Sequence, residues 1–209
     1  MKTLIPLALL AIPLVPLRAA EEISFVAESL VENSWVKAGG IDATVVTDGG
    51  KQVLELKDED SSNTCEYRFL VPAAMIPELE ERGFVMEARI KQLSYSNSII
   101  LRLRSLGQYN FGIYRDDAKG NIGVSLYAQG KDYTAQFPAT DDYFTLKAVF
   151  EPGKEMVVTI DGEPGFSFPA DEEIEPSQFS KIEIGNRVPE HDSHTLIESF
   201  RFGPAGAQP

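Results

Sequence analysis

The chain has 209 residues, of which 32 are acidic and 19 are basic, so its formal net charge is −13. This charge argues against nucleic acid and anionic membranes as partners, because binding to phosphate groups requires a basic surface. The single cysteine, Cys65, excludes an internal disulfide framework.

Residues 1–20 have the pattern of a secretory signal peptide. Lys2 provides a positive start, an apolar run with several prolines follows, and the run ends in the small residues of "RAA". Those prolines and the short run disfavour a membrane-spanning helix, which needs roughly 20 residues. We expect cleavage after Ala19 or Ala20 and a secreted or periplasmic protein that is not embedded in a membrane. The loss of Lys2 and Arg18 would lower the net charge to −15.

Residues 21–209 have the pattern of a single domain made of short strands separated by turn residues. Many strands at such close spacing predict an all-β sandwich or barrel. Residues 72–83 are typical of a helix, and two prolines limit that helix to a turn or two. The strand-like runs are residues 23–28, 52–58, 64–71, 83–93, 98–105, 109–116, 121–129, 132–137, 143–151, 156–162, 165–168, 181–185 and 196–203.

Residues 156–168 predict a hairpin. Asp161-Gly162 separates a β-branched run from an aromatic run, and a tight turn of this kind needs residues that tolerate positive φ. Residues 35–58 predict either an edge hairpin or a long loop before the first full strand. Cys65 lies in an alternating run, which favours a buried structural thiol over a reactive one.

Alternation along the strands gives the sheets one apolar face and one polar face. The apolar face is expected to fill the core. The opposite face is rich in Arg, Tyr, Asn and Gln rather than in Lys and Glu alone. The candidate ligand-binding residues on it are Glu87, Arg89, Arg102, Arg104, Asn110, Tyr114, Tyr127, Gln129 and Gln136.

The order of several motifs resembles the concanavalin A-like lectin/glucanase superfamily, in its laminin-G-like bacterial branch. These motifs are "FVMEARIKQL", "YFTLKAVFEPGKEMVVTIDGEP" and a closing "IESFRF". The resemblance covers residues 23–203 and implies a two-sheet antiparallel jelly-roll sandwich with one concave sheet. In relatives, the concave face or the loops at its rim bind glycans.

Glycoside hydrolases of this superfamily carry Glu-x-Asp-x-Glu or Glu-x-Asp-x-x-Glu on one strand, because two carboxylates must flank the glycosidic bond. That spacing is absent here, where Glu87 is followed by Arg89 and Lys91. We therefore assign no catalytic residue and disfavour an enzyme. A polysaccharide lyase, or a hydrolase similar to the 3-keto-disaccharide hydrolases, is the alternative.

The polar face suits glycan binding, because Tyr rings stack on sugars and Arg binds hydroxyls or carboxylates. Its basic residues suggest an acidic glycan. The same face could instead carry solvated ion pairs, in a structural or protein-interaction module. The leading hypothesis is an exported, non-catalytic, lectin-like domain that binds a glycan or polysaccharide on a polar concave sheet face.

Relatives often hold a structural calcium between acidic residues of the first and last strands. Glu198 stands at the usual aspartate position, and Glu28 could approach it, since calcium accepts glutamate oxygens. The segment "EHDSH" also places His191, Asp192 and His194 together. It lacks a further evident ligand, which favours a polar surface loop. We expect no other cofactor.

The signal peptide is directly testable. When the full chain is exported from a bacterial host, N-terminal sequencing of the product should begin at Ala20 or Glu21. A product that starts at Met1 in the membrane fraction would instead demonstrate a retained anchor.

Overall fold

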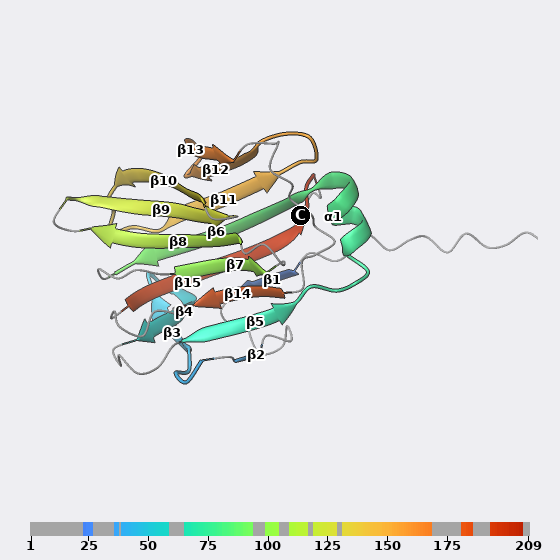
Figure 1. The fold of residues 1–209 in the computed structure, drawn as a ribbon. Coiled ribbons are helices and arrows are strands. Elements are labelled where there is room, and N and C mark those ends of the chain that lie inside the picture. Colours follow the sequence, from blue (N-terminus) through green and yellow to red (C-terminus); the bar gives the residue numbers. More distant parts are fainter. Residues whose placement is uncertain are drawn as a thin grey trace, which may run out of the picture.

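The computed structural model consists of two antiparallel sheets packed face to face (Figure 1). This arrangement confirms the predicted all-β, two-sheet antiparallel sandwich. No helix in the described part of the chain is long and apolar enough to cross a bilayer. The structure describes residues 23–26, 36–37, 39–58, 65–93, 99–104, 109–116, 119–128, 131–168, 181–185 and 193–206.

The first sheet, sheet A, contains eight strands. They are β1 (Ile23–Val26), β3 (Thr44–Asp48), β4 (Lys51–Asp58), β6 (Phe84–Gln92), β11 (Phe144–Phe150), β12 (Met156–Ile160), β13 (Glu163–Phe168) and β15 (Ser193–Pro204). Their spatial order is β13-β12-β11-β6-β15-β4-β3, and β1 also pairs with β15. The segment that predicted an edge hairpin or a long loop thus contains an edge hairpin, formed by β3 and β4.

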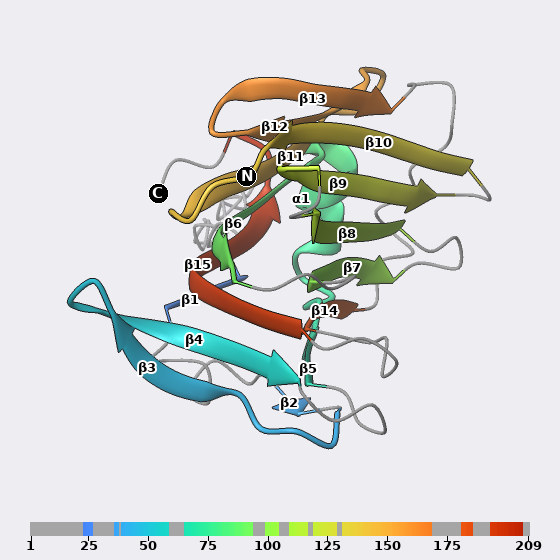
Figure 2. The same cartoon turned by 90° about the vertical axis from the view of Figure 1, so that its left-hand side faces the viewer.

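The second sheet, sheet B, contains seven strands. They are β2 (Val36–Lys37), β5 (Glu66–Leu70), β7 (Ile99–Arg104), β8 (Tyr109–Asp116), β9 (Asn121–Ala128), β10 (Lys131–Pro138) and β14 (Lys181–Gly185). Their order is β10-β9-β8-β7-β14-β5-β2. Figure 2 shows β7 to β10 stacked on the right-hand side of the molecule, with β6 and β15 of sheet A to their left.

The core lies between the two sheets and follows the predicted alternation. Along β11, Phe144 and Leu146 are 1% exposed, whereas Thr145 and Lys147 lie on the other face. Burial of such side chains supplies the main favourable free energy of folding. Further buried core residues are Cys65, Phe84, Met86, Ala88, Ile90, Ile113, Ile122, Val124, Phe150, Ile182, Ile184, Phe200 and Phe202.

The predicted short helix is α1 (Ile76–Arg82). Pro77 lies in its first turn, where a missing N–H costs little. The helix ends at Gly83, which has φ +79° and donates its N–H to the Leu79 carbonyl at 2.9 Å. A Cβ at Gly83 would lie 1.9 Å from the Phe150 carbonyl oxygen. Glycine is therefore required for α1 to pack against sheet A.

The predicted turn at Asp161-Gly162 joins β12 and β13, with φ +49° and +84° at the two residues. The Asp161 side chain accepts a hydrogen bond from the Thr145 N–H at 2.8 Å, and the Asp161 N–H donates to the Thr145 carbonyl at 2.9 Å. These bonds fasten the turn to the first residues of β11. Asp161 therefore has a structural role in the turn.

Replacing Gly162 with Val should lower the free energy of unfolding by about 1 kcal/mol or more, because a β-branched residue is strained at positive φ. Steric crowding is not the cause of this loss of stability, since no atom lies within 4 Å of the added Cβ. Asp161→Asn keeps an acceptor oxygen and tolerance of positive φ, so it should unfold at the wild-type urea concentration. Equal urea midpoints for the two variants would contradict this account.

Candidate functional site

Strand β15 changes its partner halfway along its length. It pairs with β4 from Ser193 to Ile197 and with β1 from Ser199 to Phe202. Against β6 the register shifts between Ile197 and Ser199, so Glu198 is an extra, bulged residue. Bulges redirect side chains and often occur beside functional sites. Glu198 thus lies where the β3–β4 hairpin leaves the sheet.

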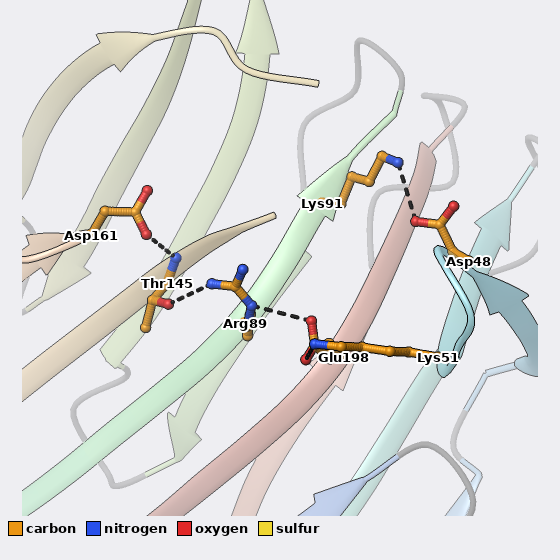
Figure 3. Close-up of polar contacts among 7 residues, drawn as sticks. All are labelled: Asp48, Lys51, Arg89, Lys91, Thr145, Asp161 and Glu198. Carbon is orange, nitrogen blue, oxygen red and sulfur yellow. Dashed lines mark hydrogen bonds and ion pairs between the residues drawn. The ribbon is translucent and has the colours of Figure 1, made fainter. Parts of the chain in front are cut away.

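The Glu198 carboxylate accepts hydrogen bonds from two cations on the outer face of sheet A, the face turned away from sheet B (Figure 3). Lys51 Nζ lies 2.5 Å from Oε1, and Arg89 Nε lies 3.1 Å from Oε2. The Lys51 ammonium, followed by the Arg89 guanidinium, holds the pKa of Glu198 below its ordinary value. The carboxylate is therefore ionised at neutral pH and links β4, β6 and β15.

The closed end of the β3–β4 hairpin bends over this face. Lys91 Nζ on β6 lies 3.1 Å from Asp48 Oδ2, although β15 and β4 separate β6 from β3. In a flat sheet three strand spacings would separate the two backbones by about 14 Å. Figure 2 shows this end of the hairpin projecting from the sandwich on the side of sheet A away from sheet B. The hydrogen bond from Lys91 is the main reason that the pKa of Asp48 is lowered.

Tyr143 immediately precedes β11 and is surrounded by charged groups of both signs. Its ring centroid lies 5.9 Å from Arg89 Cζ and 5.6 Å from Lys91 Nζ, within the range of cation–π attraction. The Tyr143 hydroxyl is buried, faces the Asp48 carboxylate and lacks a hydrogen bond of full geometry. Burial, and then the interaction with the Asp48 carboxylate, raises the pKa of Tyr143. The phenol is therefore a hydrogen-bond donor at neutral pH, with its ring left partly exposed.

The same network continues into the β12–β13 hairpin. Arg89 Nη1 donates to Thr145 Oγ1 at 3.3 Å, and the Thr145 N–H donates to Asp161 Oδ1 (Figure 3). Arg89 is thus held from two sides, by Glu198 and by Thr145. We refer to the polar group on this face as the Glu198 cluster, which consists of Asp48, Lys51, Arg89, Lys91, Tyr143 and Glu198.

A pocket of about 430 Å³ adjoins this cluster at one end of the sandwich. Tyr143 belongs to both, because it also lines the pocket. We refer to this hollow as the end pocket. Its lining residues are Ile122, Phe137, Pro138, Thr140, Asp142, Tyr143, Phe144, Ile160, Asp161 and Glu163.

The predicted binding residues do not share one face, because β6 belongs to sheet A and β7 to β10 belong to sheet B. The sequence places β6 and β7 next to each other, and alternation does not reveal that the chain crosses between sheets there. Of the residues on β6, Arg89 belongs to the Glu198 cluster. Glu87 instead contacts Arg201 Nη2 at 2.9 Å and Lys147 Nζ at 3.7 Å. Glu87 is thus part of a local ion-pair group.

The remaining predicted residues on described strands share the outer face of sheet B. The strand registers make Arg102, Asn110 and Tyr127 successive cross-strand partners. Tyr114 and Gln136 both pair with the same residue of β9. Partners of this kind lie on one face of a sheet. The backbone therefore brings these five positions together, as alternation predicted.

Part of that outer face of sheet B is covered. Glu183, which pairs with Arg102 in the same row, is 1% exposed. Its Oε1 lies 2.7 Å from Arg68 Nε and 2.9 Å from Lys181 Nζ. Arg104 pairs with Lys181 next to this group. The buried ion pairs lie at the β5–β14 side of the sheet, so a ligand on this face would have to contact β8 to β10. Gln129 lies outside the described residues.

The predicted calcium site is not assembled within the described residues. Glu28, His191 and Asp192 lie outside them, and the described part of the chain contains no group of three potential metal ligands. The Glu198 oxygens are bonded to two cations, which oppose a divalent ion by charge. His194 Nε2 lies 2.8 Å from Glu55 Oε1. Calcium binding by Glu28 and Glu198 stays a prediction.

Sequence reasoning missed Asp48, Lys51 and Tyr143, and it did not select Lys91 from the polar face of β6. Asp48 and Lys51 flank a Gly-Gly turn, and Tyr143 lies in the turn before β11. Alternation assigns faces within strands and gives no information about residues at strand ends. The segment 35–58, which contains the Gly-Gly turn, predicted either an edge hairpin or a long loop, but the contact of the hairpin with β6 follows from the bend at the Glu198 bulge.

Comparisons with known proteins reveal structural neighbours alone. No protein-family model matches the chain, and no curated protein matches its sequence. The structure of a carbohydrate esterase from the Shiga toxin-encoding bacteriophage phi24B is similar, with a TM-score of 0.66 and 19% identity. The match covers 86% of this chain and 96% of the esterase chain.

Botulinum neurotoxin structures are also similar. Neurotoxin type C matches with a TM-score of 0.60 and 11% identity, over 83% of this chain and 44% of the toxin chain. The binding domain of serotype D/C matches with a TM-score of 0.62 and 12% identity, over 87% and 48% respectively. This chain therefore spans about half of those toxin chains. At such low identity the similarity establishes a shared β-sandwich fold.

Glu198→Gln should lower the free energy of unfolding by about 1 kcal/mol at pH 7, because it removes the charge that Lys51 and Arg89 share. The folded-state pKa of Glu198 is below its ordinary value of 4.5. Its stabilising contribution is therefore complete above that pH and is lost as the pH falls through the lowered pKa. The difference between wild type and variant in urea unfolding should shrink from pH 7 to about pH 3.

The matched control is Glu155→Gln, at an exposed residue of the β11–β12 turn. It should change stability by less than about 0.5 kcal/mol at both pH values. A Glu198→Gln effect that is independent of pH would contradict the ion-pair explanation.

Proposed function

We propose that this protein is an exported, non-catalytic carbohydrate-binding domain of the concanavalin A-like, laminin-G-like type. Its structural neighbours support this proposal. One of them is described as a carbohydrate esterase, and cell entry of another, neurotoxin type C, depends on interaction with two ganglioside molecules. The signal-like residues 1–20 support export.

The observation that carries the proposal is the position of Tyr143. This partly exposed aromatic side chain lies beside a guanidinium and an ammonium, and it lines the end pocket. Sugar-binding sites combine an aromatic ring, on which the C–H face of a sugar stacks, with nearby donors for its hydroxyls. Arg89 is held by Glu198 and Thr145, so its guanidinium is oriented before a ligand arrives.

The geometry of the Glu198 cluster supports binding over catalysis. Glycoside cleavage needs a carboxylic acid with a raised pKa beside a second carboxylate. Asp48 and Glu198 are both ion-paired with lowered pKa values, so each is a poor general acid. A lyase needs a base, and the raised pKa of Tyr143 keeps its proton in place. These properties disfavour the enzyme alternatives.

The outer face of sheet B is a second surface for the same function. There Asn110, Tyr114, Tyr127 and Gln136 share one face on β8 to β10. Tyr, Asn and Gln match the chemistry of sugar hydroxyls. We rank this surface below the Glu198 cluster because the neighbouring Glu183 is buried in ion pairs.

A glycan array should first identify a ligand among neutral and acidic glycans. Tyr143→Ala should then weaken its binding about tenfold or more, because an aromatic contact contributes about 1.5 kcal/mol beyond its buried area. Tyr143→Phe keeps the ring and should bind within about threefold of wild type. Isothermal titration calorimetry measures the affinities, and thermal unfolding checks that both variants are folded.

Two results would count against the proposal in different ways. Absence of binding to every glycan on the array would overturn carbohydrate binding itself. Wild-type affinity of a folded Tyr143→Ala variant would exclude the Glu198 cluster as the site and direct attention to sheet B.

A further inference from the structure

The end pocket has an apolar floor of a size suited to sugar rings. Phe144 and Ile122 are 1% exposed and Ile160 is 7% exposed, and Phe137 packs beside them. Its volume of about 430 Å³ lies in the lower part of the range for small-molecule sites, about 300–1,000 Å³. Above this floor, the partly exposed side chains of Phe137 and Tyr143 are the apolar surfaces that a sugar ring can contact.

The rim of the end pocket has a single sign of charge. Asp142, Asp161 and Glu163 are exposed residues that line it, and its ten lining residues include no Lys or Arg. Within the described part of the chain, no cation is salt-bridged to these three carboxylates. Arg115 donates to the carbonyl of the lining residue Thr140, and Asp141 balances its charge at 2.8 Å.

The three carboxylates do not form a metal site. In the described part of the chain, no three His, Cys, Asp or Glu residues are close enough to hold a metal ion. A bare cation such as calcium needs six or more oxygens at about 2.3–2.6 Å. An acidic rim over an apolar floor instead fits an organic cation whose body fills the hollow.

We propose that the end pocket binds a hexosamine residue, a sugar ring that carries a protonated amine. The ring packs on Phe137 and Tyr143, and its ammonium lies against the carboxylates of Asp142 and Glu163. This inference rests on the proposed carbohydrate-binding function and gives the sugar class for one subsite. Arg89 and Lys91 of the neighbouring Glu198 cluster repel an ammonium, so the amine is expected in the end pocket and not beside them.

The Glu198 cluster and the end pocket share Tyr143 but favour opposite charges on a ligand. Arg89 and Lys91 contact its ring from the Glu198 cluster, where hydroxyls or acidic groups are favoured. The same side chain lines the end pocket, where acidic groups would be repelled. A glycan that reaches from the cluster into the end pocket must therefore present its amine at the pocket end.

Three β-1,4-linked tetrasaccharides test this preference, because they differ only in the group at C2. They are the glucosamine, N-acetylglucosamine and glucose tetramers, titrated calorimetrically into the mature protein at about pH 5.5, above ordinary carboxyl pKa values. The glucosamine tetramer should bind about tenfold more tightly than the two neutral tetramers. In the double variant Asp142→Asn, Glu163→Gln its affinity should fall about three- to tenfold.

The control double variant Glu80→Gln, Glu155→Gln removes the same charge at exposed positions that do not line the end pocket. It should leave the preference for the amine intact, whereas non-specific attraction to an acidic protein would weaken equally in both double variants. That equal loss would overturn the inference, as would equal affinity for all three tetramers.

The inference and the proposed function fail in distinguishable ways. If the array identifies another glycan while the glucosamine tetramer does not bind, the hexosamine subsite is wrong and carbohydrate binding stands. If no glycan binds at all, both are wrong.

Discussion

The arrangement of the outer face of sheet A depends on the ion pairs of the Glu198 carboxylate. Its bulge lies where β15 exchanges β4 for β1 as a neighbour, so the β3–β4 hairpin is free to leave the sheet. Lys51 of that hairpin and Arg89 of β6 are both bonded to it. One ionised side chain thereby fixes the bend of the hairpin and the orientation of the guanidinium. The contact between Asp48 and Lys91 follows from that bend.

A chain with a net charge of −13 gathers three of its cations in the Glu198 cluster on this face. Lys51, Arg89 and Lys91 lie around two carboxylates there, whereas the end pocket beyond Tyr143 has an acidic rim. Coulomb interactions between exposed groups are screened within about 8–10 Å in physiological salt. Each region therefore acts on a ligand through its own local charges and not through the net charge. This is why overall acidity does not define the class of sugar.

The strands, the short helix and the turn at Asp161-Gly162 could all be predicted because each depends on neighbours in sequence. Period-two alternation identified Phe144 and Leu146 as core residues, and the burial of Cys65 followed from the same pattern. The grouping of Arg102, Asn110 and Tyr127 was also predictable, since these strands follow one another and pair as hairpins. Arg89 could not be assigned to its sheet, because β6 and β7 are consecutive in sequence but belong to different sheets.

The sequence by itself determined an all-β sandwich, its buried face and the residue types available for binding, because backbone alternation and turn chemistry are local properties. The tertiary structure decided which of those residues meet. Asp48 and Lys91 are 43 residues apart, and Arg89 and Glu198 are 109 residues apart. Their contacts depend on sheet order and on one bulge. The sheet order and the bulge leave no periodic signal in the sequence, because both result from pairing between strands that are distant in sequence.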